Sequence, residues 1–308
     1  MTYPLKLKYV SKTALWGGST LKNEWNKPCD FEKLSETWEL SVRDDAVNTI
    51  LNGEYAGKTL DLYLAEHKDA APEGKFPLLI KFIDADDSLS VQVHPDDKFA
   101  AEIENDVGKT EMWYIADAKE DAELIYGIKK DAGALMCDER IEGQVNRVKV
   151  KKGDSFFIPA GMLHAIGKGC LIAEIQQNSD LTYRVYDYCR RDAAGNLRQL
   201  HTDKALKVVR YFDDKEIDAI RFSEPDAIGV GECLASSRYF KVNRLTVTDS
   251  NLLNTNGAFN SVLCVDGSGE ILSCGKTYPF ERGDSYFIPA DLGEYEIRGN
   301  ATVLISKA

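Results

Sequence analysis

The sequence predicts a mainly β protein made of two jelly-roll barrels with a few short surface helices. The chain has 308 residues, which is more than one compact core usually needs. Short apolar runs alternate with Gly, Asp and Asn, a pattern typical of many short strands. One stretch also occurs twice, because residues 153–169 (GDSFFIPAGMLHAIGKG) and residues 283–299 (GDSYFIPADLGEYEIRG) share eight identical positions. A Gly-Asp turn, an apolar strand and a Pro-Ala corner suit the edge of a double-sheet jelly roll, so the repeat predicts two barrels.

The repeat also predicts two domains. We expect the first over residues 1–222, with the short helices, and the second, a barrel like the first, over residues 223–308. The join is expected in the polar run 212–227, FDDKEIDAIRFSEPDA. Because the chain has no low-complexity segment and no long linker, the two barrels are expected to pack against each other.

The strands of the first unit follow from apolar runs bounded by turn residues. The expected strands are residues 76–85, 88–94, 111–118, 146–160 and 169–177. Helical spacing of apolar residues appears only in brief segments. The expected helices are residues 57–68, 95–106 and 202–212, the last with Thr202 as N-cap.

Composition narrows the classes of function. The net charge of −12 argues against nucleic acid or an anionic membrane as partner, because both need a basic face. A small anionic ligand is compatible with this charge if arginines and lysines cluster locally. No apolar run approaches the roughly 18 residues of a membrane span, so we expect a cytoplasmic protein. The seven cysteines are odd in number and form no CxxC pair, which favours reduced core residues over disulfides or a zinc knuckle.

Four histidines occur, and their contexts differ. His67 lies in the charged run AEHKDA and His201 precedes a helix, so both have an ordinary structural interpretation. His94 ends a strand whose alternation places Ser90, Gln92 and His94 on one face. A polar row of this kind is equally compatible with solvent exposure, so the alternation alone leaves two interpretations open.

His164 follows the Pro-Ala-Gly corner of the first repeat, and the second repeat has Glu294 at the matching position. A histidine needed only for packing or turn geometry would be expected in both copies, so a site-specific role is favoured. Two histidines from separate strands plus a carboxylate suit Zn²⁺ or a related divalent ion. Glu111 opens the strand EMWYI and is the natural carboxylate, although spacing alone does not fix it.

Several motifs together resemble the type I mannose-6-phosphate isomerases, in particular the short bacterial form built from cupin barrels. The resemblance covers nearly the whole chain. The motifs are LWGGSTL, ETWELS, SLSVQVHPDD, GKTEMWYI, GDSFFIPAGMLHAIGKG and LTYRVYDYCRRD. The family implies one zinc ion, for which other divalent metals can substitute. Its implied ligands are Gln92, His94, Glu111 and His164.

The resemblance also implies the residues that act on the substrate. The implied catalytic residues are Arg184, Glu174 and Lys109. The implied substrate or phosphate contacts are Ser90, Lys81, and Arg190 or Arg191. Ile166 stands where some relatives have a tyrosine, so a substrate contact from that position is not expected here.

The resemblance implies an aldose-ketose isomerase that interconverts mannose 6-phosphate and fructose 6-phosphate through an enediol. Glu174 is the first choice of base, with a lysine or a metal-bound water as alternatives. Arg184 stays charged, so it is expected to steady the enediolate or orient the sugar. Two other functions remain open, a sugar-phosphate-binding cupin without turnover and a mononuclear Fe(II) oxygenase. The second barrel is expected to act as a structural partner, and the oligomeric state is open.

Overall fold

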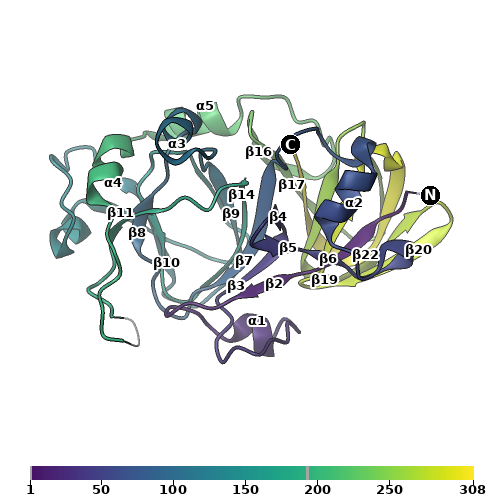
Figure 1. The fold of residues 1–308 in the computed structure, drawn as a ribbon, viewed down its shortest axis with the longest axis horizontal. Helices are drawn as coiled ribbons and strands as arrows, with labels where there is room; N and C mark the ends of the chain where they lie inside the picture. The colour runs from purple at the N-terminus through teal and green to yellow at the C-terminus, as the bar shows by residue number, and fades with distance from the viewer. Residues whose placement is uncertain (1, 192–193) are drawn as a thin grey trace.

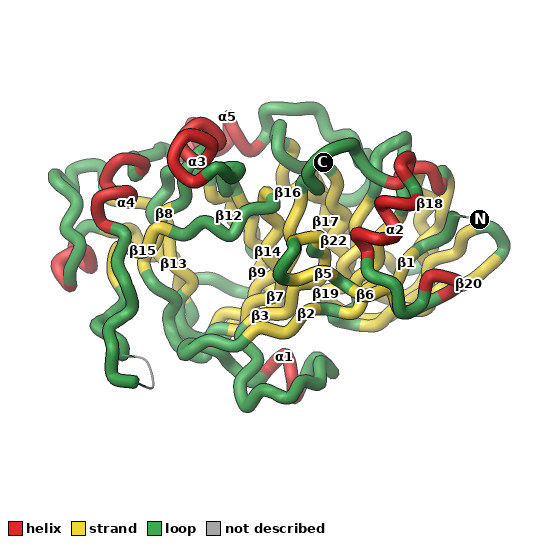
Figure 2. The backbone as a smooth tube through the Cα atoms, viewed as in Figure 1, coloured by secondary structure: helices red, strands yellow, loops and turns green. Residues whose placement is uncertain are grey.

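A computed structural model describes residues 2–191 and 194–308, and it is mainly β, as the sequence predicts (Figure 1). Two lobes lie side by side along the long axis, with the N-terminus in the same lobe as the yellow C-terminal strands. Strands fill the middle of both lobes and the helices lie on the surface (Figure 2). No helix in the described part of the chain is long and apolar enough to cross a membrane.

The first barrel contains an antiparallel six-stranded sheet and an antiparallel five-stranded sheet. In spatial order, the six-stranded sheet is β12 (Ser155–Ile158), β9 (Glu111–Ala118), β14 (Cys170–Gln177), β7 (Leu78–Asp84), β3 (Glu36–Leu40) and β2 (Val10–Lys12). The five-stranded sheet is β11 (Val145–Lys149), β10 (Glu123–Ile128), β13 (His164–Ile166), β8 (Val91–Val93) and β15 (Tyr183–Tyr186). A small hairpin joins β4 (Val42–Arg43) to β5 (Ala46–Val47).

The second barrel is built on a nine-stranded sheet. Its strands are β16 (Glu232–Ser236), β17 (Lys241–Val247), β22 (Glu294–Lys307), β19 (Asn260–Ser273), β21 (Ser285–Ile288), β1 (Leu5–Lys8), β6 (Thr49–Ile50), β18 (Ser250–Asn254) and β20 (Lys276–Glu281). This sheet takes β1 and β6 from the N-terminal part of the chain, because β1 pairs with β21. A domain boundary between residues 222 and 223 stays a prediction.

Aromatic side chains pack the two barrels against each other. One apolar cluster contains residues of both, and the ring of Phe76 lies 5.1 Å from that of Phe259, centroid to centroid. Phe157, on β12, likewise lies 6.0 Å from Phe240. The expected contact between the barrels is therefore present.

Five α-helices and four short 3₁₀ segments complete the described chain. The helices are α1 (Thr20–Asn23), α2 (Leu60–Glu66), α3 (Asp97–Glu104), α4 (Thr202–Val208) and α5 (Asp214–Arg221). The 3₁₀ segments are η1 (Gly53–Tyr55), η2 (Lys68–Ala70), η3 (Glu139–Gly143) and η4 (Ala290–Leu292). The three predicted helices are found, each shorter than its apolar spacing suggests.

Two local predictions need correction, for Thr202 and for the run 146–160, and one helix, α5, was not predicted. Thr202 is the first helical residue of α4 and not its N-cap, which is His201. The polar run at the join forms α5, whose capping box is made by Asp213 and Glu216. The run 146–160 holds two strands instead of one, because a turn at Gly153 (φ +95°) separates β11 from β12.

Candidate metal centre and active site

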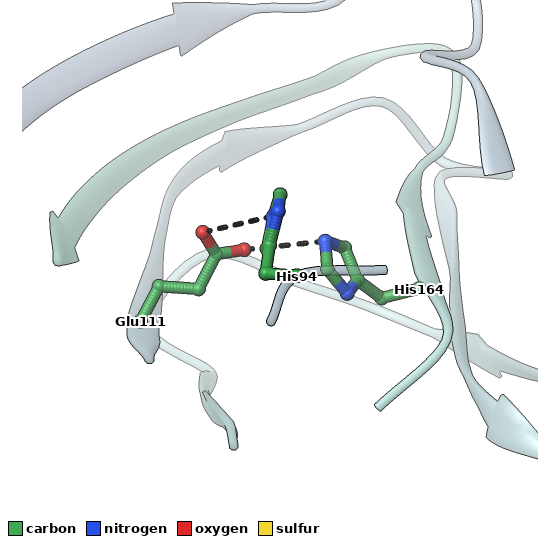
Figure 3. A group of neighbouring side chains, drawn as sticks. All are labelled: His94, Glu111 and His164. Carbon is green, nitrogen blue, oxygen red and sulfur yellow. Dashed lines mark ion pairs between the residues drawn. The ribbon is translucent and has the colours of Figure 1, made fainter. Parts of the chain in front are cut away.

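Three side chains meet between the two sheets of the first barrel: His94, Glu111 and His164 (Figure 3). His94 follows β8, His164 opens β13, and Glu111 opens β9 on the other sheet. One candidate ligand atom from each lies within 4.8 Å of those of the other two. All three side chains are at most 1% exposed. The polar row ending at His94 is therefore not explained by solvent exposure.

Both imidazoles turn the same ring atom toward Glu111. The Nδ1 atom of His94 lies 2.7 Å from the carbonyl oxygen of Leu181, and that of His164 lies 2.9 Å from the carbonyl oxygen of Met162. A carbonyl accepts only, so each Nδ1 carries the proton and each Nε2 keeps a lone pair. The Nε2 atoms lie 3.5 Å (His94) and 3.4 Å (His164) from Glu111. This is the tautomer that a metal ligand needs.

Glu111 provides the observation that tests whether a cation fits. Its side chain is fully buried, and neither carboxylate oxygen accepts a hydrogen bond of good geometry within the described residues, although the ammonium of Lys109 lies 3.1 Å from Oε2. Burial, followed by the charge of Glu174, raises the pKa of Glu111. Burial keeps the pKa of His164 at about 4, so this ring is neutral near pH 7. Two neutral imidazoles and an unsatisfied carboxylate fit a divalent cation.

Gln92 completes the neighbourhood from β8. It pairs in register with His164 on one side and Arg184 on the other. Its amide nitrogen lies 3.4 Å from Nε2 of His164, and its amide oxygen accepts a hydrogen bond from Ser90. A half turn of the amide exchanges these two atoms and brings the oxygen to the side of His164. The side chain thus lies beside His164, and its role as a ligand, which the family resemblance implies, stays a prediction.

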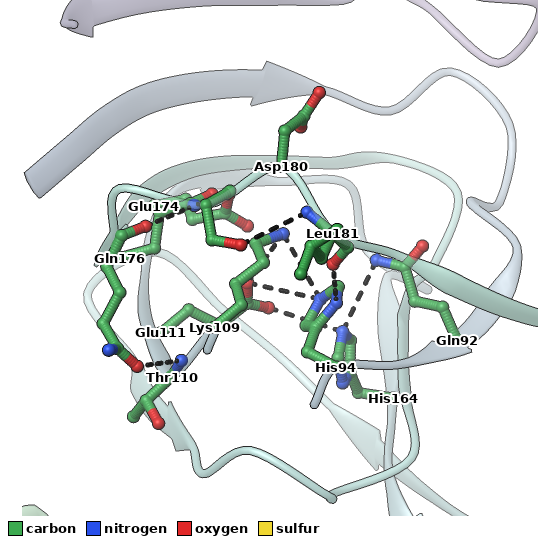
Figure 4. Close-up of polar contacts among 12 residues, drawn as sticks. Gln92, His94, Lys109, Thr110, Glu111, His164, Glu174, Gln176, Asp180 and Leu181 are labelled. Atoms are coloured by element: carbon green, nitrogen blue, oxygen red, sulfur yellow. Dashed lines mark hydrogen bonds and ion pairs between the residues drawn. The ribbon is translucent and has the colours of Figure 1, made fainter. Parts of the chain in front are cut away.

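Lys109 also belongs to this centre (Figure 4). Its ammonium nitrogen lies 3.1 Å from Glu111 and 3.3 Å from Nε2 of His94, and the residue is 4% exposed. Lys109 therefore places a positive charge beside two of the three residues that could hold a cation.

Glu174 lies on β14, which neighbours the strand of Glu111. Its carboxylate accepts a hydrogen bond of 3.0 Å from the indole of Trp113 and lies 3.5 Å from the ammonium of Lys81. Burial alone would raise the pKa of Glu174, but Lys109 and Lys81 outweigh burial and lower it. Glu174 is therefore ionised at neutral pH and able to accept a proton.

Lys81, on β7, is held by acidic neighbours. Its ammonium lies 3.6 Å from Glu36, 3.5 Å from Glu174 and 3.9 Å from Asp180. Burial lowers the pKa of Lys81, but these three carboxylates reverse the effect and raise it. Lys81 is thus a fixed positive charge, which suits contact with an anionic substrate better than proton removal.

The remaining predicted residues come from β8, β15 and the segment after it. Ser90 is buried beside Gln92. Arg184 lies across from Gln92, and burial, followed by Arg198, lowers its pKa. Arg190 binds the carboxylate of Asp187 and the carbonyl of Ser88.

The other two positions singled out by the sequence lie apart from the metal centre. Arg191 is exposed and donates to the carbonyl of Gly195, so the structure does not bring it to the cluster of site residues. Ile166 is buried in the main apolar core, which agrees with the absence of a substrate contact from this position.

Comparison with known proteins places this site in a family. A model described as phosphomannose isomerase type I, catalytic domain, matches residues 5–133, and one described as mannose-6-phosphate isomerase, cupin domain, matches residues 232–308. The probable mannose-6-phosphate isomerase GmuF of Bacillus subtilis is 40% identical over 317 residues, covering 99% of both chains. The chain belongs to the type I mannose-6-phosphate isomerase family.

Other relatives agree with this family. The mannose-6-phosphate isomerase ManA of Bacillus subtilis is 37% identical and covers 99% of both chains. The crystal structure of a Bacillus subtilis mannose 6-phosphate isomerase superposes with a TM-score of 0.87 at 34% identity, over 98% of this chain and 99% of that one. A putative mannosephosphate isomerase from Archaeoglobus fulgidus shares the fold, with a TM-score of 0.75 at 20% identity, over 99% and 97% of the two chains. The protein is thus an isomerase with a cupin fold and a divalent-metal site.

The second barrel of this isomerase has other side chains where the first has its candidate ligands. In the first barrel Ile158 of β12 lies opposite Glu111. The repeated strand β21 pairs in the same way, and Ile288 lies opposite Asn260. The amide of Asn260 donates a 2.8 Å hydrogen bond to the hydroxyl of Tyr295, and both residues are buried. In the second barrel, the neutral Asn260, hydrogen-bonded to Tyr295, therefore stands at the position that charged Glu111 has in the first.

Several residues of the isomerase site had no signal of their own in the sequence. Glu36 and Trp113 contact site residues on neighbouring strands through the register of the sheets, whereas Asp180, Asp187 and Arg198 lie in the segments before and after β15. Glu36, Trp113 and Asp187 lie in motifs that carry the family resemblance, ETWELS, GKTEMWYI and LTYRVYDYCRRD, but nothing there shows what they touch. These residues are Glu36, Trp113, Asp180, Asp187 and Arg198.

Proposed function

We propose that this protein interconverts mannose 6-phosphate and fructose 6-phosphate through an enediol, with one zinc ion in the first barrel. The single observation that carries the proposal is the buried pair of imidazole lone pairs facing the unsatisfied carboxylate of Glu111. The proposed ligands are Gln92, His94, Glu111 and His164. A mixed set of imidazole nitrogen and oxygen donors suits zinc, and related divalent ions compete for it.

When bound, such an ion supplies electrostatic stabilisation of the negative charge that develops on the neighbouring sugar oxygens. The chain's own residues handle the protons. Glu174 is proposed to accept the proton from C2 of mannose 6-phosphate and to return it to C1. In the same conversion O1 gains a proton and O2 loses one, so the aldose becomes the ketose with no net change in atoms.

The geometry of Glu174 supports this role. One oxygen, Oε2, is occupied by Trp113, while Oε1 accepts no hydrogen bond within the described chain and lies 3.5 Å from Lys81. An ionised carboxylate with one uncommitted oxygen can take up a proton without first breaking a hydrogen bond. The lowered pKa of Glu174 makes the ionised form dominant before substrate binds.

The cationic side chains are proposed to position the substrate. Lys109 is proposed to donate hydrogen bonds to the sugar oxygens at C1 and C2, because its ammonium lies beside Glu111 and His94. Arg184 is proposed to steady the enediolate, since it shares the face of Gln92. The proposed contacts to the rest of the sugar phosphate are Ser90, Lys81 and Arg190. Of the alternatives Arg190 and Arg191, Arg190 is preferred because Arg191 is exposed and donates to the carbonyl of Gly195. Binding energy from the phosphate can orient the reacting carbons.

Neither alternative function is favoured by the family. A binding module without turnover has no need of an ionised carboxylate held beside the metal site. An Fe(II) oxygenase would use molecular oxygen, whereas the relatives are named as isomerases. We also propose a cytoplasmic location, which agrees with seven free cysteines.

Metal replacement tests the zinc proposal. The protein is treated with a chelator, dialysed, and reloaded with one equivalent of Zn²⁺, Mn²⁺, Co²⁺ or Fe²⁺. Fructose 6-phosphate formation from mannose 6-phosphate is followed for each sample, and bound metal is measured by mass spectrometry. We expect activity to be lost with the metal and restored by one Zn²⁺ per chain. Full activity in metal-free protein would contradict the proposal.

A further inference from the structure

A group of arginines surrounds one buried carboxylate next to β15, the strand on which Arg184 pairs with Gln92. Asp187 follows β15 and is 4% exposed. Its Oδ1 atom accepts hydrogen bonds from Arg190 at 2.5 Å and from Arg198 at 3.3 Å. Arg184 lies on β15 itself. Burial lowers the pKa of Arg184, and the positive charge of Arg198 lowers it further. We call Arg184, Asp187, Arg190 and Arg198 the arginine cluster.

The chain folds back on itself to form the arginine cluster. The backbone nitrogen of His201 donates to the carbonyl of Arg184 at 2.7 Å, and the backbone nitrogen of Arg184 donates to Nδ1 of His201 at 3.1 Å. A guanidinium nitrogen of Arg184 also donates to the carbonyl of Gln199 at 2.8 Å. These three bonds hold the returning segment against β15, so Arg198 is fixed in position beside Arg184.

The arginine cluster carries more positive charge than its carboxylate can balance. Two guanidinium groups, of Arg190 and Arg198, bind one buried carboxylate, and the charges of both also act on Arg184 nearby. The next acid, Asp87, is 3.6 Å from Arg190 but 59% exposed. In addition, Nε of Arg184 is buried and makes no hydrogen bond within the described residues. Like charges gathered in a partly buried place are costly unless an anion joins them. The whole chain has a net charge of −12, so this local excess of positive charge does not follow from its overall composition.

The four members of the arginine cluster are not equally available to a ligand. Arg190 already donates from Nε, Nη1 and Nη2 to Asp187 and Ser88, and its side chain is 15% exposed. Arg198 contributes one longer bond to Asp187, and its side chain is 28% exposed. Among the described residues, Asp187 thus holds Arg198 through one nitrogen, Nη1.

We propose that Arg198 binds the phosphate group of the substrate and sets the preference for a phosphorylated sugar. This inference rests on the proposed function and extends it to a residue outside the motifs that carry the family resemblance. A guanidinium binds phosphate through two parallel hydrogen bonds, which a lysine cannot reproduce. Asp187 acts as the positioning residue for Arg198, Arg190 shares this carboxylate beside it, and Arg184 joins the phosphate subsite to the metal centre.

Steady-state kinetics of Arg198→Gln tests the proposal. The matched control is Arg298→Gln, which makes the same change of charge in an arginine that pairs with Glu296 in the second barrel. We expect Arg198→Gln to raise KM for mannose 6-phosphate, and the inhibition constant of inorganic phosphate, by about tenfold to a hundredfold. The value of kcat and the metal content should change little. Arg198→Lys should recover part of the loss, and Arg298→Gln should match the wild type.

The outcomes separate this inference from the proposed function. Unchanged KM and unchanged phosphate inhibition in Arg198→Gln would overturn the role of Arg198. A fall in kcat, metal content and thermal stability together, with KM preserved, would show a structural role and also overturn it. If the wild type does not convert mannose 6-phosphate, the proposed function fails. In that case, calorimetric titration of the wild type and Arg198→Gln with inorganic phosphate tests whether Arg198 binds phosphate. If Arg198→Gln does not fold, Arg198→Lys takes its place in both experiments.

Discussion

The indole nitrogen of Trp113 donates a 3.0 Å hydrogen bond to Oε2 of Glu174, and the two residues lie opposite each other on neighbouring strands β9 and β14. The bond fixes the carboxylate in a fully buried place. It also leaves Oε1 as the oxygen available to a substrate. Trp113 is therefore a positioning residue for the proposed base.

Replacing Trp113 with phenylalanine should weaken catalysis without releasing the metal. The variant keeps an aromatic ring but removes the donor that stabilises ionised Glu174, so the pKa of Glu174 should rise. We expect kcat to fall about tenfold, with the acid limb of its pH profile moved to higher pH. Kinetics over a range of pH, with metal content as control, measures this. A variant with an unaltered pH profile would show that the bond has no catalytic importance.

Glu174→Gln should abolish most turnover while leaving substrate binding. The amide has nearly the same shape but cannot accept the proton from carbon. We expect kcat to fall by about 10²–10⁴-fold, with zinc content and the inhibition constant of phosphate near those of the wild type. Retention of full activity with metal in place would assign the proton transfer to another group.

In the metal-free protein, buried His164 should contribute a loss of stability in acid, while Glu111, whose pKa burial raises, contributes in the opposite direction. Comparison with His164→Gln isolates the share of His164. Burial lowers the pKa of His164 to about 4, below the value of about 6.5 in an unfolded chain. The folded state then resists protonation more than the unfolded state does. The stabilisation is present above pH ~6.5 and is lost as pH falls toward 4, and a shift of this size corresponds to about 3 kcal/mol. Urea unfolding of chelated protein measures it, and His164→Gln should flatten the slope.

Glu39→Gln should destabilise the contact between the barrels. Lys27 pairs with Glu39 at 2.7 Å, both side chains are at most 3% exposed, and Lys27 also donates to the carbonyl of Gly283 in the second barrel. Removing one partner leaves a buried charge, which costs about 3–5 kcal/mol in the free energy of unfolding. The double variant Lys27→Met, Glu39→Leu should recover much of this loss. Equal stability of Glu39→Gln and wild type in urea unfolding would be the contrary result.

Most of the correct predictions of fold and site came from the repeated stretch and from the contexts of the histidines. The matched strands β12 and β21 confirm that one unit occurs twice, and Glu294, which replaces His164 in the second copy, is exposed at the start of β22. Alternation placed Gln92 and His94 on one face because strand periodicity is local. Both lie in the site that the structure describes.

The remaining features depend on register between distant segments. Trp113 reaches Glu174, and Arg198 reaches Asp187, only through pairing that no local pattern encodes. Helix α5 escaped prediction because its run is short and polar, with Ile217 as its one buried residue. The split of residues 146–160 depended on a left-handed glycine at Gly153, which an alternating pattern does not reveal.

The central claim is a metal-dependent proton transfer between C2 and C1 of a sugar phosphate. NMR of mannose 6-phosphate with zinc-loaded protein in D₂O, beside a chelated sample, measures it directly. We predict fructose 6-phosphate in the zinc-loaded sample alone, with deuterium from solvent at the exchanging carbon. No conversion by folded protein carrying one zinc ion per chain would contradict the account.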